Sequence, residues 1–286
     1  MAIATETLRL IQPKWLEPET LLNLKRRYDT AHPYPHIAID GFLDESVATM
    51  LYEHFPKLSQ MKTHYDGLNE RKAEDSQFEQ YHPIFRELRA ELFSPTFLRF
   101  LETLTGISNL TTCEGPLGAG THQGGNGSYL DLHIDFNIHP TEPLHRRINV
   151  LIFLNKFWKE DYGGQLELWD EHLTACGAAY LPIFNRCVIF ETNDRSYHGY
   201  SKISVPAHES RKSFYAYYYT PAPKEIKYHD TTFRTRPNEP FTKKAQTLVK
   251  EHTKNFIKRQ LKNLGLIELY NRTFFALKTR NKEKAE

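Results

Sequence analysis

The stretch Ile148-Asn-Val-Leu-Ile-Phe-Leu154 is an apolar run of strand length near the centre of the chain. Three further runs of strand length follow it, at residues 164–169, 186–191 and 213–219. Gly, Pro and Asn residues separate these runs, as they do between short antiparallel strands. The pattern therefore predicts a sandwich or barrel of antiparallel strands in the middle third of the chain.

Helical patterns precede this β-rich region. Residues 18–28 have apolar residues at helical spacing, and residues 83–106 suit one long helix or two short ones. Residues 35–43 alternate as a strand does, and Asp44 is the expected N-cap of a helix that ends near residue 55. These elements are predicted to pack on the sheet.

Three segments carry weaker signals. The polar, charged residues 57–80 are expected to form either a surface loop or a lid over a site. Six glycines between residues 115 and 127 predict a turn-rich stretch. Beyond residue 221 the strands are expected to stop at a proline-containing linker, which is followed by helices at residues 242–264 and 266–277.

The domain organisation follows from these patterns. We divide the chain into an N-terminal helical support with an early strand (1–106), a β core (107–223) and a basic C-terminal helical extension (224–286). A chain of 286 residues is long enough to bury one large core, so we expect the three parts to form one compact unit.

Composition limits the class of protein. Hydrophobic residues make up 40% and charged residues 25%, as in ordinary globular proteins, while 16 Tyr and 18 Phe favour strands and an aromatic pocket. Three cysteines without a CxxC pair fit a reducing compartment. No apolar stretch approaches the length of a membrane span. These features predict a cytoplasmic protein with no membrane partner.

Charge is distributed unevenly along the chain. Residues 241–286 hold 12 Lys and Arg against 4 Asp and Glu, which leaves 25 against 31 in the rest, although the net charge is only +2. A basic tail can bind nucleic acid, but the solvated face of an amphipathic helix explains it more simply. We therefore expect no nucleic-acid partner, and the sequence gives no indication of the oligomeric state.

The triplet His133-Ile-Asp135 carries the strongest chemical signal. Residues two apart on a strand point to the same face, so both side chains are expected to face the interior of the β core. His198 follows the apolar run 187–190 and can approach them from a neighbouring strand. Two imidazoles and one carboxylate hold one face of a non-haem Fe(II) ion and leave the other face open. We predict that His133, Asp135 and His198 are metal ligands with a catalytic role.

Other histidines compete for this role. His139 precedes a proline and lies past the expected strand end, so it is not expected to bind the metal. His122, His145, His172 and His208 are expected at the surface or around the ligands.

Arg211 opens the aromatic strand 211–219. A guanidinium at the start of an inward-facing strand is poorly explained by packing, but it suits a bidentate clamp on a carboxylate. 2-Oxoglutarate has one carboxylate and a keto oxygen for the metal and a distal carboxylate for such a clamp. Alternation places Ser213, Tyr215 and Tyr217 on the same face as Arg211.

Residues 129–220 resemble the prolyl-4-hydroxylase-type 2-oxoglutarate/Fe(II) oxygenases. The matching pieces, in the order of that family, are His133-Ile-Asp135, Arg146-Arg-Ile-Asn-Val-Leu-Ile-Phe-Leu-Asn155, Lys156-Phe-Trp, Gly163-Gly-Gln-Leu-Glu-Leu-Trp169, His198 and Arg211. The opening Pro33-Tyr-Pro-His-Ile-Ala-Ile-Asp-Gly-Phe-Leu-Asp extends the resemblance to about residues 33–220. The C-terminal 60 or so residues match no family that we can name.

The resemblance implies a mainly β fold with flanking helices around a double-stranded β-helix (jelly-roll) core. It implies Fe(II), 2-oxoglutarate and O2 as cofactor and cosubstrates, and it leaves room for ascorbate as a reductant. Tyr129 occupies a position where relatives often have a pocket aromatic. Relatives that use a Tyr hydroxyl to hold the distal carboxylate have it where this chain has Phe153, so that hydrogen bond is expected from Tyr215 or Asn149, or is absent.

The function implied is a hydroxylase of the 2-oxoglutarate-dependent dioxygenase class. It would act on an unactivated C–H bond of a small-molecule or peptidyl substrate, such as a prolyl or other amino-acid residue. Asp135 argues against halogenases of the same fold, which leave that ligand position empty. The alternatives are a cupin-like metalloenzyme, whose His-x-His motif is not present at this triplet, and a non-catalytic jelly-roll binding module.

Overall fold

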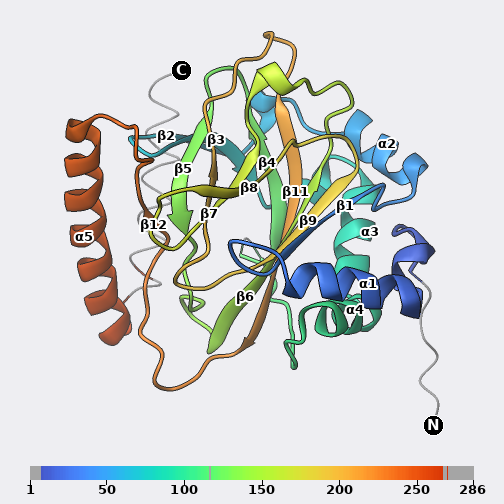
Figure 1. The fold of residues 1–286 in the computed structure, drawn as a ribbon, viewed down its shortest axis with the longest axis horizontal. Helices are drawn as coiled ribbons and strands as arrows, with labels where there is room; N and C mark the ends of the chain where they lie inside the picture. Colours follow the sequence, from blue (N-terminus) through green and yellow to red (C-terminus); the bar gives the residue numbers. More distant parts are fainter. Residues whose placement is uncertain (1–7, 116, 267–268, 270–286) are drawn as a thin grey trace.

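Twelve antiparallel strands curl into a nearly closed barrel with helices on its outside (Figure 1). The computed structural model describes residues 8–115, 117–266 and 269. The strands are β1 (His36–Asp40), β2 (Thr63–Asp66), β3 (Glu70–Asp75), β4 (Ala119–Gly124), β5 (Tyr129–Ile134), β6 (Leu144–Phe153), β7 (Leu166–Trp169), β8 (Cys176–Tyr180), β9 (Arg186–Glu191), β10 (Tyr197–Tyr200), β11 (Arg211–Pro221) and β12 (Thr232–Phe233). This architecture confirms the predicted mainly β class with a jelly-roll core.

The strands form two halves that face each other. One half has the order β1-β9-β6-β11-β4, and the other has the order β5-β10-β7-β8. Strand β3 joins the halves because it pairs with β4 through Ala73 opposite Gln123 and with β5 through Glu70 opposite Leu130. Strand β12 also pairs with β5, so β3 and β12 both lie against the strand that carries His133.

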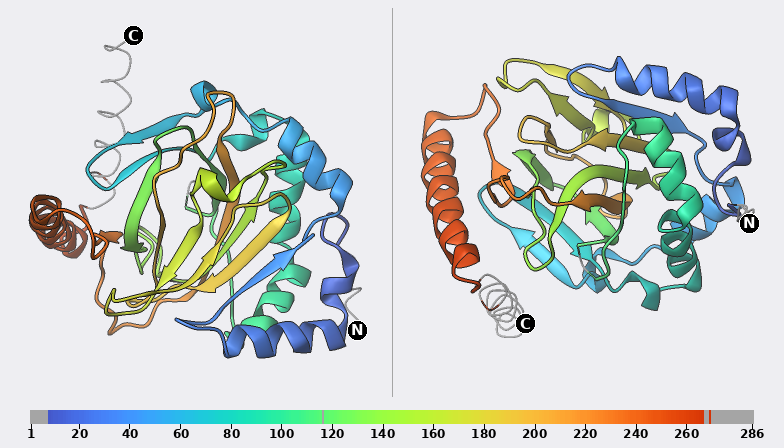
Figure 2. Two further views of the ribbon diagram at one scale, coloured as in Figure 1. Left: turned by 45° about the horizontal axis from the view of Figure 1, so that its top comes forward. Right: turned by 90° about the horizontal axis from the view of Figure 1, so that it is seen from below.

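Helices cover two sides of the barrel (Figure 2). Those in the described residues are α1 (Pro18–Asp29), α2 (Glu45–Glu53), α3 (Pro83–Leu92), α4 (Pro95–Thr105) and α5 (Phe241–Asn263), with short 3-10 helices η1 (Pro13–Leu16), η2 (Leu58–Gln60), η3 (Phe78–Gln80) and η4 (Glu160–Tyr162). Helices α1 to α4 gather on one side, whereas α5 lies on the other side beside β12. No described helix combines the length and the apolar character that crossing a bilayer requires.

The helix boundaries follow local sequence rules. The Asp44 side chain accepts a hydrogen bond from the backbone N–H of Ser46, which confirms the predicted N-cap of α2. Residues 83–106 form two helices rather than one, because Pro95 cannot continue a helix and Ser94 caps the next one through the N–H of Phe97.

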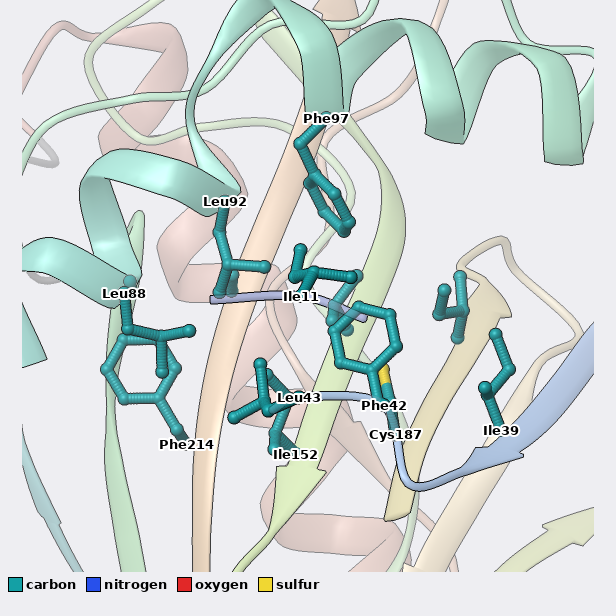
Figure 3. Close-up of a cluster of buried hydrophobic side chains, with 14 of the residues drawn as sticks. Ile11, Ile39, Phe42, Leu43, Leu88, Leu92, Phe97, Ile152, Cys187 and Phe214 are labelled. Atoms are coloured by element: carbon teal, nitrogen blue, oxygen red, sulfur yellow. The ribbon is translucent and has the colours of Figure 1, made fainter. Parts of the chain in front are cut away.

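The main hydrophobic core lies between the helices α1 to α4 and the outer face of the first half of the barrel. Leu88 and Leu92 from α3 and Phe97 from α4 point towards Phe214 on β11 and Ile152 on β6 (Figure 3). All five side chains are fully buried. Burying large apolar side chains on this scale is the dominant stabilising contribution to such a fold. The opposite, inner face of these strands is thereby left to line the barrel interior.

Two bulges alter which residues face that interior. On β5, His133 is opposite His198 while Leu130 is opposite Tyr200, so three steps on β5 match two on β10. On β6, Ile148 and Arg146 are opposite the consecutive residues Tyr218 and Tyr219 of β11. Each bulge inserts one residue and shifts the alternation by one position.

Several predictions about segments were wrong. Most of residues 57–80 form neither a surface loop nor a separate lid. Strands β2 and β3 form a hairpin in this segment, and β3 belongs to the barrel. The glycine-rich stretch contains β4, whose residues are all buried. Strands do not stop at residue 221, since β12 follows. The helix predicted at 242–264 is confirmed as α5, whereas most of 266–277 lies outside the described residues.

Helix α5 also departs from the expected solvated basic face. Lys250, Lys254, Lys258 and Lys262, spaced four residues apart, turn towards the barrel, where they donate hydrogen bonds to Asn69 Oδ1, Thr231 O, Asp230 Oδ2 and His139 O respectively. The large apolar residues Leu248, Val249 and Phe256 are exposed instead. The basic face therefore docks the helix.

Gly199 permits the close pairing of β10 with the bulge on β5. A Cβ atom at position 199 would lie 2.6 Å from the carbonyl oxygen of Leu130 and 2.8 Å from that of Asp131, both of which are backbone atoms. We predict that Gly199→Ala lowers the free energy of unfolding by about 1–3 kcal/mol, measured by urea denaturation, because the strands must separate. Gly67→Ala is the matched control, since its Cβ would meet only the Glu70 carbonyl oxygen at 4.0 Å. Equal stabilities of the two variants would contradict this account.

Candidate active site

The predicted metal ligands meet inside the barrel. His133 on β5 and His198 on β10 are direct cross-strand neighbours, and Asp135 follows the end of β5. Asp135 Oδ1 lies 3.8 Å from His133 Nε2, and its Oδ2 lies 3.5 Å from His198 Nε2. One ligand atom from each residue lies within 4.8 Å of the other two, which suits a single divalent ion. Among the described residues this is the one cluster of at least three such side chains.

The backbone fixes which nitrogen of each histidine faces the centre. His133 Nδ1 lies 3.0 Å from the carbonyl oxygen of Asp131, and His198 Nδ1 lies 3.0 Å from that of Ser196. A carbonyl oxygen can only accept, so each Nδ1 carries the hydrogen. The Nε2 lone pairs are then free to bind a metal, in the arrangement that metal-binding histidines usually have.

Burial and nearby charges set the protonation states that a metal needs. Burial lowers the pKa of His133 to about 3, with His198 as the next contributor, and it also lowers the pKa of His198. Burial alone would raise the pKa of Asp135, but Arg146 and the two imidazoles outweigh it and hold that pKa well below its usual range. Neutral imidazoles and an ionised carboxylate at pH 7 are the forms that bind a divalent cation.

Arg146 and Asn149 hold Asp135 in place. Arg146 Nη2 lies 3.0 Å from Asp135 Oδ2, and Asn149 Nδ2 donates to the same oxygen at 2.8 Å. Arg146 also donates to Asn149 Oδ1 through Nε at 3.0 Å and through Nη2 at 2.8 Å. The guanidinium carbon lies 3.5 Å from the ring centroid of Tyr217. The carboxylate is therefore oriented through Oδ2, and Oδ1 faces His133.

Arg211 is a buried cation without an anionic partner. Its side chain is 2% exposed, and among the described residues no carboxylate lies within ion-pair distance of it. Its Nε donates to the carbonyl oxygen of Gly164 at 2.8 Å, and its guanidinium carbon lies 4.9 Å from the ring centroid of Phe153. Burial lowers its pKa to about 10, so it remains charged at pH 7. A buried, unpaired charge is costly, which makes the position a ready anion site.

A single cavity connects the ligands with Arg211. It has a volume of about 560 Å³, and its lining includes His133, Asp135, His198 and Arg211. Leu151 and Leu166 are apolar residues in the wall of the same cavity. The arrangement can hold a metal at one end and a carboxylate at the other end of the same small molecule.

Most of the predicted cosubstrate residues line this cavity. Ser213, Tyr215 and Tyr217 do so, and the two tyrosine rings stack with centroids 4.7 Å apart. Phe153 is fully buried beneath Arg211, so that position offers no hydroxyl, as the sequence indicated.

One of the predictions for this site needs correction. Tyr129 is not among the residues that line the cavity, because the β5 bulge turns Leu130 inward in its place, and the Tyr129 hydroxyl donates to the Gly67 carbonyl at 2.7 Å. Asn149 does line the cavity, but both ends of its amide are engaged by Asp135 and Arg146. The Asn149 amide therefore links Asp135 to Arg146, and its role as a cosubstrate residue stays a prediction.

Several residues that line the cavity were not predicted from the sequence. Arg146 was not predicted because strict alternation from Asn149 would point its side chain out of the barrel. The bulge on β6 turns this side chain into the cavity. His122 was assigned to the surface or the surroundings of the ligands, yet it is 8% exposed and lines the cavity, as do Tyr200 and Lys72. The Gly120-Thr-His122-Gln-Gly124 pattern, with small residues on either side of an inward histidine, was a usable signal for β4.

Comparisons with known proteins agree with this site. The model of the 2OG-Fe(II) oxygenase superfamily matches residues 119–219, from β4 into β11. No curated protein sequence matches the chain. The superfamily match agrees with the resemblance found in the sequence: residues 119–219 match a 2-oxoglutarate-dependent dioxygenase domain, and this superfamily uses Fe(II), 2-oxoglutarate and O2.

Solved structures of the same fold include two prolyl hydroxylases. One, from Trichoplax adhaerens in complex with a peptide fragment of the hypoxia inducible factor oxygen degradation domain, has 20% identity and a TM-score of 0.51 over 73% of this chain and 96% of that chain. A prolyl 4-hydroxylase from Phytophthora capsici has 15% identity and a TM-score of 0.51 over 99% and 93%. A non-heme alpha ketoglutarate dependent epimerase of nogalamycin biosynthesis has 15% identity and a TM-score of 0.50 over 73% and 88%. At these identities the likeness establishes the fold.

The ligand set can be tested by removing its carboxylate. We predict that Asp135→Asn abolishes tight binding of Mn(II), used as a redox-stable substitute for Fe(II) and measured by isothermal titration calorimetry. The loss of Mn(II) affinity should be larger than the loss of about 10- to 100-fold that is typical when a residue that only supports a ligand is removed. Asp161→Asn, a change at an exposed carboxylate, is the control. Unchanged Mn(II) affinity in Asp135→Asn would contradict the ligand assignment.

The supporting role of Asn149 gives a second test. Asn149→Ala removes the amide that donates to Asp135, so Mn(II) binding should weaken by about 10- to 100-fold while the fold persists. Asn155→Ala is the matched control, because Asn155 is a buried asparagine next to β6 whose amide donates to Pro182 and Lys212 carbonyls instead. If both variants lose metal affinity equally, the effect of Asn149 is general destabilisation.

Proposed function

We propose that the protein is a hydroxylase in which His133, Asp135 and His198 hold Fe(II) and Arg211 holds 2-oxoglutarate. One observation carries the proposal: three metal-binding side chains share one cavity with a buried guanidinium that pairs with no carboxylate of the described residues. A binding module for a neutral ligand would have no need to bury either group. Both lie where a small dicarboxylate can reach them together.

In the reaction, bound Fe(II) and 2-oxoglutarate supply the oxidising chemistry, by which one atom of O2 enters succinate, CO2 is released, and the other atom enters a substrate C–H bond as a hydroxyl group. The chain contributes binding, orientation and exclusion of water. Arg146 and Asn149 keep Asp135 ionised and oriented towards the histidines. Phe190 packs on His198 with ring centroids 4.8 Å apart, and Phe233 packs on His133 at 5.4 Å. These rings limit the access of water to the ligands.

We propose an amino-acid side chain, free or within a peptide, as the substrate, with proline as the first candidate. The remaining cavity walls support this because they carry both signs of charge. On β3, Lys72 Nζ lies 3.4 Å from a carboxylate oxygen of Glu70 and 2.6 Å from one of Glu74. On the side of α5, Lys258 Nζ lies 2.8 Å from Asp230 Oδ2. A molecule with an ammonium or amide N–H and a carbonyl or carboxylate could use both.

A reducing compartment such as the cytoplasm is the proposed location. Its support is the state of the cysteines, since Cys113, Cys176 and Cys187 are all free. Cys113 and Cys187 are buried as apolar residues, whereas Cys176 is exposed and would be open to oxidation elsewhere.

Ligand binding and turnover test the function directly. With Mn(II) present, N-oxalylglycine at 100 times its Kd should raise the melting temperature by about 5–10 °C. Arg211→Met should keep the shift caused by Mn(II) alone but lose the additional shift caused by N-oxalylglycine. With Fe(II), 2-oxoglutarate and candidate amino acids or peptides, succinate should form together with a product heavier by one oxygen atom.

Two outcomes would count against the proposal. A protein with neither a metal-dependent shift nor succinate release would be a binding module. Succinate release with a substrate of unchanged mass would indicate another reaction of the same fold, such as epimerisation.

A further inference from the structure

Two buried polar atoms of residues that line the cavity with Arg211 have no hydrogen-bond partner among the described residues. They are the hydroxyl oxygen of Tyr200 and Nε2 of His122. Tyr200 and His122 are 1% and 8% exposed, and both line the cavity with Arg211. Buried polar groups without partners are uncommon, and several in one place indicate a ligand or ordered water.

Tyr200 packs against the Arg211 guanidinium, whose central carbon lies 4.3 Å from the ring centroid of Tyr200. The His122 ring meets the Tyr200 ring edge-on, with centroids 5.7 Å apart, and His122 is the cross-strand partner of Ser213. Arg211 itself is opposite Gly124, where an added Cβ would lie only 3.2 Å from the Tyr200 hydroxyl. The bare glycine therefore leaves room for that hydroxyl beside the cation.

Both groups are in the protonation state that can donate to an anion. The Tyr200 side chain has a phenolic O–H that can donate one hydrogen bond. Burial, with Lys72 and Arg211 nearby, holds the pKa of His122 well below its usual value, so its ring is neutral and has one N–H. Phe153, which also contacts Arg211, cannot donate.

We propose that Tyr200 and His122 complete the anion site of Arg211, so that the distal carboxylate of 2-oxoglutarate accepts hydrogen bonds from all three side chains. This inference rests on the proposed function, because it concerns the cosubstrate of that reaction. The hydrogen-bond donor that Phe153 cannot supply then comes from Tyr200 on β10, two residues after the ligand His198. Cosubstrate recognition and metal binding then share one four-residue strand.

The test compares two ligands that differ only at the distal end. Titrations of the Mn(II)-loaded full-length chain with 2-oxoglutarate and with 2-oxopentanoate, in which a methyl group replaces the distal carboxylate, report binding without turnover. Tyr200→Phe should weaken 2-oxoglutarate by about 10- to 100-fold, the usual loss for a hydrogen bond to a charged group, and should leave 2-oxopentanoate unchanged. His122→Leu should show the same selectivity with a smaller loss.

Tyr197→Phe is the matched control, since it removes a hydroxyl from the same strand outside the cavity lining. Tyr200→Phe deletes a partnerless buried hydroxyl, so the ligand-free variant should melt at the same temperature as the unmodified chain or higher. An unfolded or less stable variant would show that the hydroxyl has a structural role, and would overturn the inference.

The remaining outcomes separate the inference from the function. Unchanged 2-oxoglutarate affinity in Tyr200→Phe, or equal weakening of both ligands, overturns the inference while the proposed function stands. No binding of 2-oxoglutarate by the unmodified Mn(II)-loaded chain overturns both.

Discussion

The buried ion pair between Arg146 and Asp135 is the interaction on which the site depends. A carboxylate taken out of water tends to become protonated, and a protonated carboxyl group is a poor metal ligand. Arg146, only 3% exposed, reverses that tendency and shares Asp135 Oδ2 with Asn149. The pair is oriented by the Tyr217 ring below the guanidinium. Of the groups that lower the pKa of Asp135, Arg146 contributes most.

This ion pair exists because the strands are irregular. In a regular strand Arg146 and Asn149 would point to opposite faces, and so would Leu130 and His133. The bulges on β6 and β5 turn both members of each pair into the same cavity. Glycines then allow the close approaches that follow, above all Gly199 against the carbonyls of Leu130 and Asp131. Irregular pairing thus concentrates functional groups that regular alternation would separate.

The same irregularities set the limit of prediction from sequence. The triplet spacing of His133 and Asp135 and the position of Arg211 at a strand start were readable because those segments alternate normally. Tyr129 was misplaced and Arg146 was overlooked because a bulge leaves no trace in the alternation of one chain. Strand β4 was not predicted because glycines usually indicate turns. Here the glycines of β4 leave space for the side chains of Tyr200 and Tyr215. Segments 57–80 and 224–240 contribute strands through pairing with β5, which their own sequences do not encode.

The basic C-terminal segment shows how pairing can reverse an argument from composition. A run of lysines on a helix usually faces water, but here the hydrogen-bond acceptors lie on the barrel side, in backbone carbonyls and in Asp230. Lys243 and Arg236 likewise meet the buried carboxylate of Asp131, two residues before His133 on β5. The positive charge is therefore neutralised where α5 and its preceding loop dock on the ligand strand. Within the described part of α5, the basic side chains attach this wall of the cavity.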